Sequence, residues 1–295
     1  MKQRVLVLGG AGFLGSHVIF KLLEKGYIVT NIDLNSLKIK HKNFIEKSVN
    51  VLNELNFFSK NKDSFDYIIN FAGISDLDYC HNNPKESLTT NILSNLNIID
   101  IFKDSKSLIK YIYASSAYAS GTSGSFYAVG KKTCENIIKE YSNSYNLKYT
   151  ILRYGSLYGI GSDNRNSIFR FITSALKSSE IIYKGTGSEI REFINVKDAA
   201  DLTLNSLESR YDNQTLMLTG TNSMKYSELF DLINEIMGNS LSIKIIKNDR
   251  KTHYKTTPYS FDSNIVKKLT NNPHIDLGEG LIELMKEINE NNKFE

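Results

Sequence analysis

The sequence predicts an α/β fold in which a parallel sheet is covered by helices on both faces. Short apolar runs typical of buried strands recur along the first half of the chain, at residues 4–8, 28–32, 67–72, 110–114 and 149–153. Helical patterns lie between them, at residues 13–25, 84–104 and 126–145. A chain that alternates strand and helix forms a parallel, doubly wound sheet. A cluster of glycines between the first strand and the first helix supports the same fold.

Composition narrows the class of protein. With 295 residues the chain can form one large or two modest domains, and its 41% hydrophobic content is ordinary for a globular protein. The formal charge of +4 is small and scattered, which argues against nucleic-acid or membrane partners. No apolar run approaches the ~20 residues of a membrane span. Cys80 and Cys134 lack metal-binding spacing and no signal segment precedes the first strand, so we expect a cytoplasmic protein without a metal.

The first three elements form a strand–helix–strand unit. The run VLVL at residues 5–8 is apolar throughout, as expected of a strand buried on both faces. The helix over residues 13–25 ends at Gly26. Its apolar residues recur at helical spacing and are Phe13, Leu14, Val18, Ile19, Leu22 and Leu23. The second strand, IVTNI at residues 28–32, is followed by Asp33.

Three glycines between the first strand and the first helix follow the pattern Gly9-x-x-Gly12-x-x-Gly15. One glycine permits a tight turn, a second lets a pyrophosphate approach the backbone, and a third lets the helix pack on the sheet. The N-terminus of the helix then offers N–H groups and a favourable dipole to the phosphates. In this context the pattern predicts a dinucleotide site, whereas alone it would indicate only a tight turn.

Asp33 predicts which dinucleotide binds. It lies 21 residues after Gly12, at the end of the second strand. A carboxylate at this point accepts hydrogen bonds from the adenosine ribose and repels a 2′-phosphate. Lys38 is the nearest cation, so we expect NAD in preference to NADP. The alternative is that Asp33 is an ordinary turn residue.

The second half of the chain is less regular, which predicts a second domain. Glycines at 155, 159 and 161 mark loops, and helices are expected near 165–178, 226–238 and 278–290. We therefore expect a dinucleotide-binding Rossmann domain over residues 1–155, with later segments near 190–215 returning to it. Residues 156–295 are expected to form mainly a smaller C-terminal α/β substrate domain.

A second group of residues predicts the chemistry. Tyr127 and Lys131 are four residues apart in a helical pattern, so they share one face of that helix. Ser115 and Ser116 follow a strand, at the end where open α/β sheets bind ligands. A neighbouring ammonium lowers a tyrosine pKa from about 10 toward neutrality, which suits Tyr127 to act as acid and base. Outside this context, Tyr127 and Lys131 would indicate only two ordinary side chains on the surface of a helix.

Together these motifs resemble the extended short-chain dehydrogenase/reductase family, in its NAD-dependent nucleotide-sugar epimerase/dehydratase branch. The resemblance covers nearly the whole chain. Its motifs are GGAGFLGSH at 9–17, FAG at 71–73, TTN at 89–91, SSA at 115–117, LRYGSLYG at 152–159 and REFINVKDAAD at 191–201. It implies a Rossmann-type doubly wound sheet, NAD as cofactor, a nucleotide-sugar substrate and a homodimer.

The resemblance also implies roles for individual residues. The implied catalytic residues are Ser116, Tyr127 and Lys131. The implied cofactor contacts are Tyr127, Lys131, Gly9, Gly12, Phe13, Leu14, Gly15, Asp33, Leu34, Asn50, Ala72, Gly73, Asn91 and Tyr154. The implied substrate contacts are Ser75, Ser116, Ser156, Arg191 and Arg250, with His253 and Lys255 as further phosphate contacts. The alternative for Arg191 is an ion pair with Glu189 or Glu192.

The sequence departs from the family pattern in ways that concern the substrate. Ala119-Ser120-Gly121 stands in place of Val-Tyr-Gly, Ser156 stands in place of asparagine, and only ten residues separate Ser116 from Tyr127. Ala117 and Tyr118 stand where the family's sugar 4,6-dehydratases carry Asp-Glu, so we expect no such activity.

We expect an NAD-dependent epimerase that acts on a nucleotide-activated sugar, at C4 through a transient 4-keto intermediate, in surface polysaccharide or related sugar biosynthesis. A nucleotide-sugar 4-ketoreductase or C4 dehydrogenase is the nearest alternative, because the same residues would serve it. A non-catalytic dinucleotide-binding protein is a third, which the complete set of Ser116, Tyr127 and Lys131 argues against. No motif supplies a second acid or base for a neighbouring carbon.

Overall fold

The computed structural model describes residues 2–121, 123–247, 253, 255–256 and 266–292. The strands in this part of the chain are β1 (Arg4–Leu8), β2 (Ile28–Ile32), β3 (Phe44–Lys47), β4 (Tyr67–Asn70), β5 (Lys110–Ser116), β6 (Tyr149–Tyr154), β7 (Ser156–Tyr158), β8 (Glu180–Lys184), β9 (Ile190–Asn195), β10 (Gln214–Leu218), β11 (Ser223–Lys225), β12 (Ser242–Ile246) and β13 (Lys267–Leu269).

The α-helices are α1 (Phe13–Glu24), α2 (Asn56–Lys60), α3 (Leu77–Asn82), α4 (Pro84–Leu88), α5 (Ser94–Phe102), α6 (Ser125–Tyr145), α7 (Ser167–Ser178), α8 (Val196–Asn205), α9 (Tyr226–Ile236) and α10 (Leu277–Asn292). A π-helical turn, η1 (Thr89–Leu93), and two 3₁₀ turns, η2 (Ala117–Ser120) and η3 (Ser209–Tyr211), complete the set. Among these helices, none has both the length and the apolar content needed to cross a membrane.

The main sheet has eight strands in the order β13-β10-β6-β5-β4-β1-β2-β3. All neighbouring pairs in it are parallel. The order reverses between β1 and β4, because the chain first extends the sheet through β2 and β3 and then through β4, β5 and β6. The carboxyl ends of the strands at such a reversal form the crevice in which α/β sheets bind ligands. This confirms the predicted fold class.

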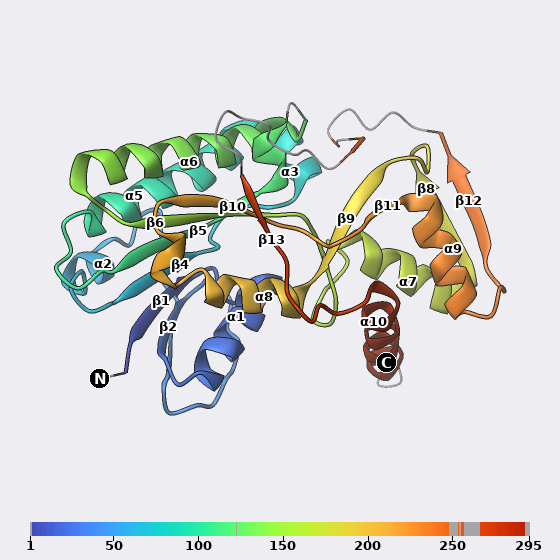
Figure 1. Cartoon of the computed structure of the whole chain (residues 1–295), viewed down its shortest axis with the longest axis horizontal. Coiled ribbons are helices and arrows are strands. Elements are labelled where there is room, and N and C mark those ends of the chain that lie inside the picture. The colour runs from blue at the N-terminus through green and yellow to red at the C-terminus, as the bar shows by residue number, and fades with distance from the viewer. Residues whose placement is uncertain (1, 122, 248–252, 254, 257–265, 293–295) are drawn as a thin grey trace.

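Helices cover both faces of the main sheet, with α1 and α8 on one side and α5 and α6 on the other (Figure 1). The alternation of side chains along β1 supplies both cores. Val5 and Val7 pack with the α1 and α8 residues, whereas Leu6 and Leu8 pack with the α5 and α6 residues. All four side chains are almost completely buried, which explains why this strand is apolar throughout.

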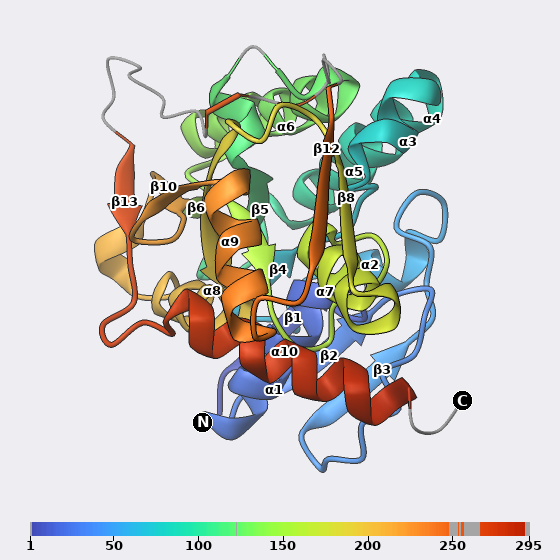
Figure 2. The same cartoon turned by 90° about the vertical axis from the view of Figure 1, so that its right-hand side faces the viewer.

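The part of the chain after β6 builds a second lobe beyond the carboxyl ends of the sheet (Figures 1 and 2). It contains the mixed sheet β11-β9-β7 and the parallel pair β12-β8, packed with α7, α9 and α10. Its core is aromatic: the rings of Tyr183 and Tyr226 stack at 4.8 Å between centroids, Phe171 meets both of them edge-on, and Phe230 meets Tyr183 edge-on. These residues anchor the strands that face the crevice.

The chain returns from this lobe to the main sheet. Helix α8 packs beside α1, and β10 pairs with β6. A second return brings β13 to the outer edge beside β10. We expected returning segments near residues 190–215, and β13 lies outside that range.

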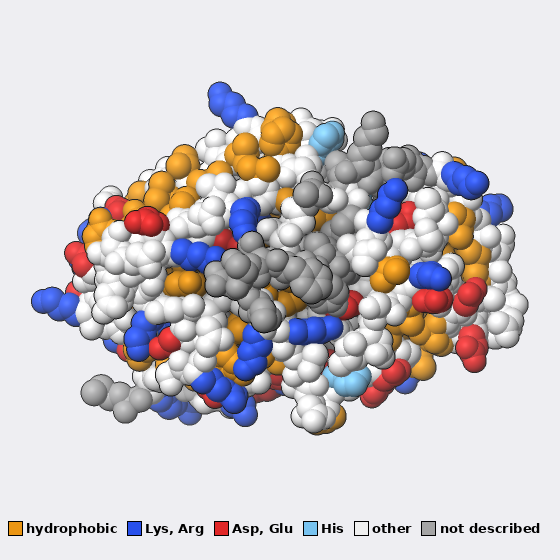
Figure 3. Space-filling model, turned by 45° about the horizontal axis from the view of Figure 1, so that its top comes forward, with side chains coloured by type: hydrophobic (Ala, Val, Ile, Leu, Met, Phe, Trp, Pro, Cys, Tyr) orange, Lys and Arg blue, Asp and Glu red, His pale blue; other side chains and the backbone are white. Residues whose placement is uncertain are grey.

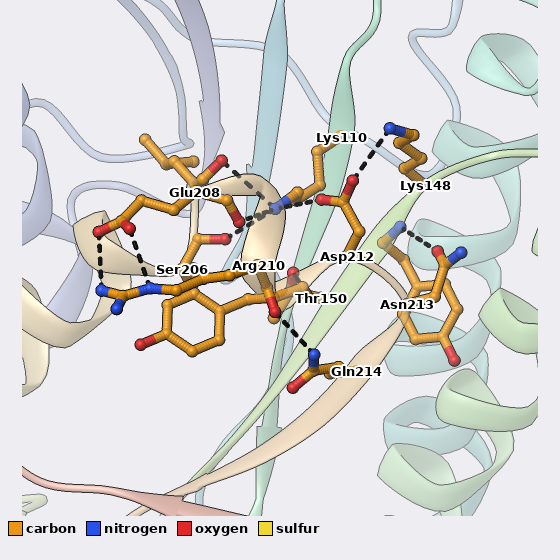
Figure 4. A network of polar contacts seen from close by, with 12 residues as sticks. Lys110, Lys148, Thr150, Ser206, Glu208, Arg210, Asp212, Asn213 and Gln214 are labelled. Atoms are coloured by element: carbon orange, nitrogen blue, oxygen red, sulfur yellow. Dashed lines mark hydrogen bonds and ion pairs between the residues drawn. The ribbon is translucent and has the colours of Figure 1, made fainter.

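A buried lysine joins β5 to the end of α8 (Figure 4). The side chain of Lys110 is 0% exposed, and its Nζ donates to the carbonyl oxygens of Ser206, Leu207 and Glu208 at 2.7–3.3 Å. It also forms an ion pair with Asp212 at 2.6 Å. Ser206, Leu207 and Glu208 directly follow the last residue of α8, and a cation is favourable there because the C-terminal end of a helix carries partial negative charge. The contact fixes α8 to the centre of the sheet.

The helix expected over residues 84–104 is interrupted. The π-helical turn η1 separates α4 from α5 and carries Asn91 at its centre. The Asn91 side chain accepts from the Ile74 N–H at 2.7 Å and donates to the Ile74 carbonyl oxygen at 3.0 Å. A sequence-distant contact therefore shapes this turn, as is common for π-helical turns near functional sites.

Candidate active site

The glycine loop lies at the reversal point of the sheet, between β1 and α1. Gly9 has φ of +74°, and a Cβ there would lie 2.8 Å from the Ala72 nitrogen. A Cβ on Gly15 would lie 2.7 Å from the Gly10 Cα, because α1 begins close against the end of β1. No described side chain caps the N-terminus of α1. Its first N–H groups are therefore available to the phosphates of a dinucleotide.

Asp33 lies directly beside this loop. Its Oδ2 accepts from the Ala11 N–H at 2.9 Å, and its Oδ1 accepts from the Asn35 N–H at 2.9 Å. The carboxylate thus fixes the loop to the end of β2, and each oxygen keeps a second lone pair for a ribose hydroxyl. Leu34 is 67% exposed next to it and offers an apolar surface. These residues fit an NAD molecule whose adenosine lies at the end of β2.

The chain after β4 forms the opposite wall of the crevice. Ala72 and Gly73 lie here, and Gly73 has φ of +146° with its Cα facing the Asn91 amide. Because both ends of that amide bond Ile74, Asn91 supports the wall. The structure therefore gives Asn91 a role in holding Ala72 and Gly73 in place, and a direct cofactor contact stays a prediction.

Ser116, Tyr127 and Lys131 come from the end of β5 and the first turns of α6. All three are buried, with 6–8% of each residue exposed. The Lys131 Nζ lies 5.8 Å from the centre of the Tyr127 ring and donates to the Ala114 carbonyl oxygen at 2.7 Å. The Ser116 hydroxyl oxygen accepts from the Tyr118 N–H at 3.3 Å. The lysine is thus held between the end of β5 and the ring of the tyrosine.

Burial changes the acidity of this lysine. Removal from water lowers the pKa of Lys131 to about 8, and Cys134, Glu135 and Cys80 oppose the change. A charged ammonium in a buried position interacts strongly with neighbouring groups, because little solvent screens it. Lys131 therefore brings a poorly screened positive charge close to the Tyr127 ring when it is protonated.

A buried ion pair that the sequence reasoning missed lies behind this set. Arg153 of β6 donates from Nε and Nη2 to both carboxylate oxygens of Glu135 on α6, at 2.8 and 2.6 Å. Ser115 donates to Glu135 at 2.6 Å, and Arg153 donates to the Ser120 hydroxyl at 2.7 Å. Ser115 is therefore a partner of this ion pair. The signal in the sequence is a single charged residue, Arg153, in the strand YTILRY, which is otherwise uncharged.

The other expected contacts lie in several places. Asn50 forms a turn after β3, where its Oδ1 accepts from the Leu52 N–H at 2.9 Å. The Tyr154 side chain points into the core instead of the crevice, because its hydroxyl pairs with Thr203 of α8 at 2.7 Å. Ser75 is exposed after β4, and Ser156 is half-buried at the start of β7. Arg250 lies outside the described residues.

Arg191 lies in the second lobe on β9. It is 4% exposed, its Nη1 donates to the Ile190 carbonyl oxygen at 2.9 Å, and its guanidinium lies 5.4 Å from the centre of the Tyr226 ring. The suggested partner Glu192 forms an ion pair with Lys268 at 2.9 Å. Arg191 is therefore held by the aromatic core of the lobe.

His253 lies beside Tyr118, and its expected contact with a phosphate stays a prediction. Its Nδ1 lies 3.2 Å from the Tyr118 hydroxyl oxygen, and the Tyr118 ring packs against Tyr127 with 6.2 Å between centroids. Lys255 is exposed, and its carbonyl oxygen accepts from the Ile190 N–H at 2.7 Å. Tyr118 was not among the site residues expected from the sequence, and its contact with His253 was not expected either.

A separate cavity of about 200 Å³ lies between the ends of β9 and β10 and the start of α10. None of the expected site residues lines it. In the described part of the chain, no three His, Cys, Asp or Glu side chains are grouped as a metal site would need.

A dinucleotide-binding loop beside a serine, tyrosine and lysine set defines an enzyme that transfers hydride through a bound nicotinamide cofactor. The chain belongs to the NAD dependent epimerase/dehydratase family, whose model matches residues 5–216.

Known relatives share most of their length with this chain. A putative UDP-glucose 4-epimerase of Methanocaldococcus jannaschii is 28% identical, over 98% of this chain and 99% of the relative. A UDP-N-acetyl-alpha-D-glucosaminuronate decarboxylase of Bacillus cytotoxicus is 26% identical, over 82% and 83%. The solved UDP-N-acetylglucosamine 4-epimerase of Methanobrevibacter ruminantium M1, in complex with UDP-N-acetylmuramic acid, has a TM-score of 0.83 and 25% identity, over 99% and 100%.

Proposed function

We propose that this protein is an NAD-dependent epimerase that inverts C4 of a UDP-activated sugar through a transient 4-keto intermediate. The observation that carries the proposal is the position of Lys131, buried between the end of β5 and the Tyr127 ring beside Ser116. This arrangement moves a proton at a hydroxyl group. The names of two similar proteins, both 4-epimerases acting on UDP-sugars, support the reaction and the substrate class.

Each residue of the set has a separate task. Tyr127 takes the proton from the sugar hydroxyl as the ketone forms and returns it when the hydroxyl is restored. Lys131 favours the phenolate form of Tyr127 through its charge. Ser116 donates a hydrogen bond to the sugar oxygen and holds it beside Tyr127. The same tyrosine serves both faces of the sugar, provided that the keto-sugar turns between the two steps.

The cofactor residues hold the dinucleotide beside this set. Bound NAD would supply a reversible hydride acceptor for C4 of the sugar. Gly9, Gly12 and Gly15 allow its pyrophosphate to approach the backbone at the N-terminus of α1. Asp33 accepts from the adenosine ribose. Ala72 and Gly73 form the wall on the far side, and Tyr127 and Lys131 lie next to the nicotinamide end.

We also propose a division of labour between the two parts of the chain. Residues 1–155, together with the returning segments, bind NAD, and residues 156–295 mainly bind the substrate. Arg191, held against Tyr226, contacts the diphosphate, since a guanidinium binds phosphate oxygens in a bidentate manner. Ser75 and Ser156 contact the sugar or its nucleotide.

The proposed assembly is a homodimer. Phe126, Val129 and Tyr145 of α6 are 37%, 54% and 48% exposed, and Leu93 of the neighbouring turn is 44% exposed. Figure 3 shows apolar side chains gathered over the part of the molecule formed by α6, while basic and acidic side chains are interspersed elsewhere on that face. Burial of such a surface against a second copy is favourable. A cytoplasmic location follows from the proposed nucleotide-sugar substrate and NAD.

The test is to incubate the purified protein with a panel of UDP-sugars and NAD. Products are separated by chromatography and identified by NMR, and NADH is followed by absorbance. We expect a C4 epimer without net NADH. Replacement of Tyr127 by Phe removes one hydroxyl and is expected to reduce turnover by about 10² or more while NAD binding persists. Tyr27→Phe, at a half-buried tyrosine just before β2 that the proposed site does not include, is the matched control.

Other results assign other functions. Stoichiometric NADH with a keto-sugar would indicate a dehydrogenase, and consumption of NADH on a keto-sugar would indicate a reductase. Loss of 44 Da from a UDP-hexuronic acid would indicate a decarboxylase, the activity in the name of one relative. NAD binding without turnover of any sugar would indicate a binding protein.

A further inference from the structure

Tyr118 lies directly against the proposed acid and base. Its ring meets the Tyr127 ring at 78°, with 6.2 Å between centroids. Its backbone N–H donates to the Ser116 hydroxyl oxygen at 3.3 Å. Gly124 makes room for the ring, because a Cβ there would lie 2.5 Å from the Tyr118 Cδ1. The short connection between β5 and α6 therefore places a second phenol next to the first.

His253 reaches this phenol from the second lobe. Its Nδ1 lies 3.2 Å from the Tyr118 hydroxyl oxygen. Two and three residues further on, the Lys255 carbonyl oxygen accepts from the Ile190 N–H of β9 at 2.7 Å and Thr256 forms a bridge with Ile190. Tyr118 and His253 are both half-buried. The phenol of Tyr118, on η2, thus meets the imidazole of His253 next to Tyr127.

We infer that Tyr118 and His253 form a second proton-transfer pair, which exchanges the hydrogen on the carbon next to the sugar carbonyl. The inference rests on the proposed function, because that reaction generates the 4-keto sugar. Oxidation at C4 makes the hydrogens on C3 and C5 acidic. Tyr127 is occupied at the C4 oxygen, so a proton on a neighbouring carbon needs another acceptor. The Tyr118 ring packs edge-on against the Tyr127 ring, so its phenol lies on the same side of the site and next to the proposed acid and base.

The step leaves the oxidation state of the sugar unchanged. The C–H bond next to the carbonyl breaks, and its electron pair forms a C=C bond while the carbonyl π pair moves onto oxygen. Tyr118 takes the proton on its phenol oxygen as it passes its own proton to Nδ1 of His253. Ser116 and Tyr127 donate hydrogen bonds to the enolate oxygen. The reverse transfer returns a proton from Tyr118 to the same face of the carbon, and the pair exchanges protons with solvent between turnovers.

Deuterium exchange tests this directly. Hydride transfer at C4 carries no solvent hydrogen to carbon, so deuterium on carbon reports only the second pair. The probe is UDP-4-keto-6-deoxyglucose in D₂O with NAD, followed by mass spectrometry and by NMR at C3 and C5, against a sample without protein. Reduction of the same compound by NADH measures the step at Tyr127 separately.

Two variants separate proton transfer from structural support. Tyr118→Phe removes the phenol oxygen and keeps the ring packed on Tyr127. His253→Asn keeps a hydrogen-bonding group near the position of Nδ1 but takes up no proton near neutral pH. We expect the ratio of exchange to reduction to fall at least tenfold in both. Tyr27→Phe and His41→Asn change residues of the same types before and after β2, which the proposed site does not include, and should leave this ratio as it is.

The outcomes distinguish this inference from the proposed function. Reduction without exchange by the unmodified protein overturns the pair and leaves the epimerase intact. The pair is also overturned if deuterium exchange persists in both variants, or if exchange and reduction fall by the same factor so that their ratio does not change. Exchange without epimerisation of any UDP-sugar keeps the pair and removes the proposed function. Absence of both exchange and reduction removes both.

Discussion

Arg153 and Glu135 form a bidentate ion pair in the interior of the protein, with side chains that are 2% and 0% exposed. The pair joins β6 to α6, and its hydroxyl partners extend it to β5 and η2. These are the elements that carry Ser116, Tyr127 and Lys131. The position of the proposed catalytic set therefore depends on a polar contact that lies behind it.

Removal of one member of this pair should destabilise the protein strongly. Glu135→Gln leaves the Arg153 charge buried without an opposite charge, which costs about 3–5 kcal/mol. Glu140→Gln changes an exposed acid on the same helix and should cost less than about 0.5 kcal/mol. Unfolding in urea, followed by circular dichroism, measures both. Similar midpoints for the two variants would show that solvent reaches the pair.

Lys131 should lower stability while it supports activity. A pKa of about 8 against the ordinary 10.5 corresponds to roughly 3 kcal/mol for burying the charge. Lys131→Met should therefore raise the free energy of unfolding at pH 7 by about 1–3 kcal/mol, since it also loses the bond to Ala114, and should reduce turnover sharply. Lys60→Met, at an exposed lysine of α2, should change neither quantity.

The increase in the free energy of unfolding caused by Lys131→Met should depend on pH. Below pH 8 the lysine is charged in both the folded and the unfolded chain, so the burial penalty is fully present. Between about 8 and 10.5 the unfolded chain binds the extra proton, so the unmodified protein becomes relatively more stable as pH rises. The advantage of the variant should therefore shrink over this range. Urea unfolding at pH 7 and pH 9.5 checks it, and a constant advantage would contradict the assigned pKa.

Two lysines that bind the same carboxylate should differ in their contribution to stability. Lys110→Ala leaves Asp212 and three carbonyl oxygens without a buried cation and should cost about 3–5 kcal/mol. Lys148 lies 3.0 Å from Asp212 but is 53% exposed, so Lys148→Ala should cost less than about 1 kcal/mol. Thermal and urea unfolding compare them. Equal losses would mean that the contacts with α8 contribute little.

Asp33 should determine the preference for NAD. The carboxylate repels the 2′-phosphate of NADP, so Asp33→Ala should narrow the difference between the two affinities. It also removes the bond to the Ala11 N–H, so NAD itself should bind more weakly. Fluorescence titration with both dinucleotides measures this. NADP binding as tight as NAD binding in the unmodified protein would refute the assignment.

The sequence allowed prediction of those parts of the site that are close together in the chain. The glycine loop with Asp33, and Tyr127 with Lys131, each lie within one supersecondary unit, where local spacing determines the arrangement. Tyr118 and His253 are 135 residues apart, and no local pattern connects them. Motifs read one at a time along the chain therefore could not bring these two side chains together.

The same limit applies to the fold. Long apolar runs predicted the inner strands, whereas β13 has the sequence KKL and only three residues. Its pairing with β10 depends on tertiary structure rather than on its own composition. Likewise, the break around Asn91 follows from its bonds to Ile74, which helical periodicity cannot reveal.

The order of strands has a consequence for synthesis of the protein on the ribosome. Strand β6 is buried along its whole length, yet its outer neighbour β10 is translated about 60 residues later, and β13 later still. Until those residues emerge, the nascent chain presents an unpaired apolar edge of the kind that draws other strands into aggregates. Chaperone dependence during expression should therefore be greatest before residue 214 is translated. Truncation before β10 should give insoluble protein, even though it spares every residue proposed to bind NAD.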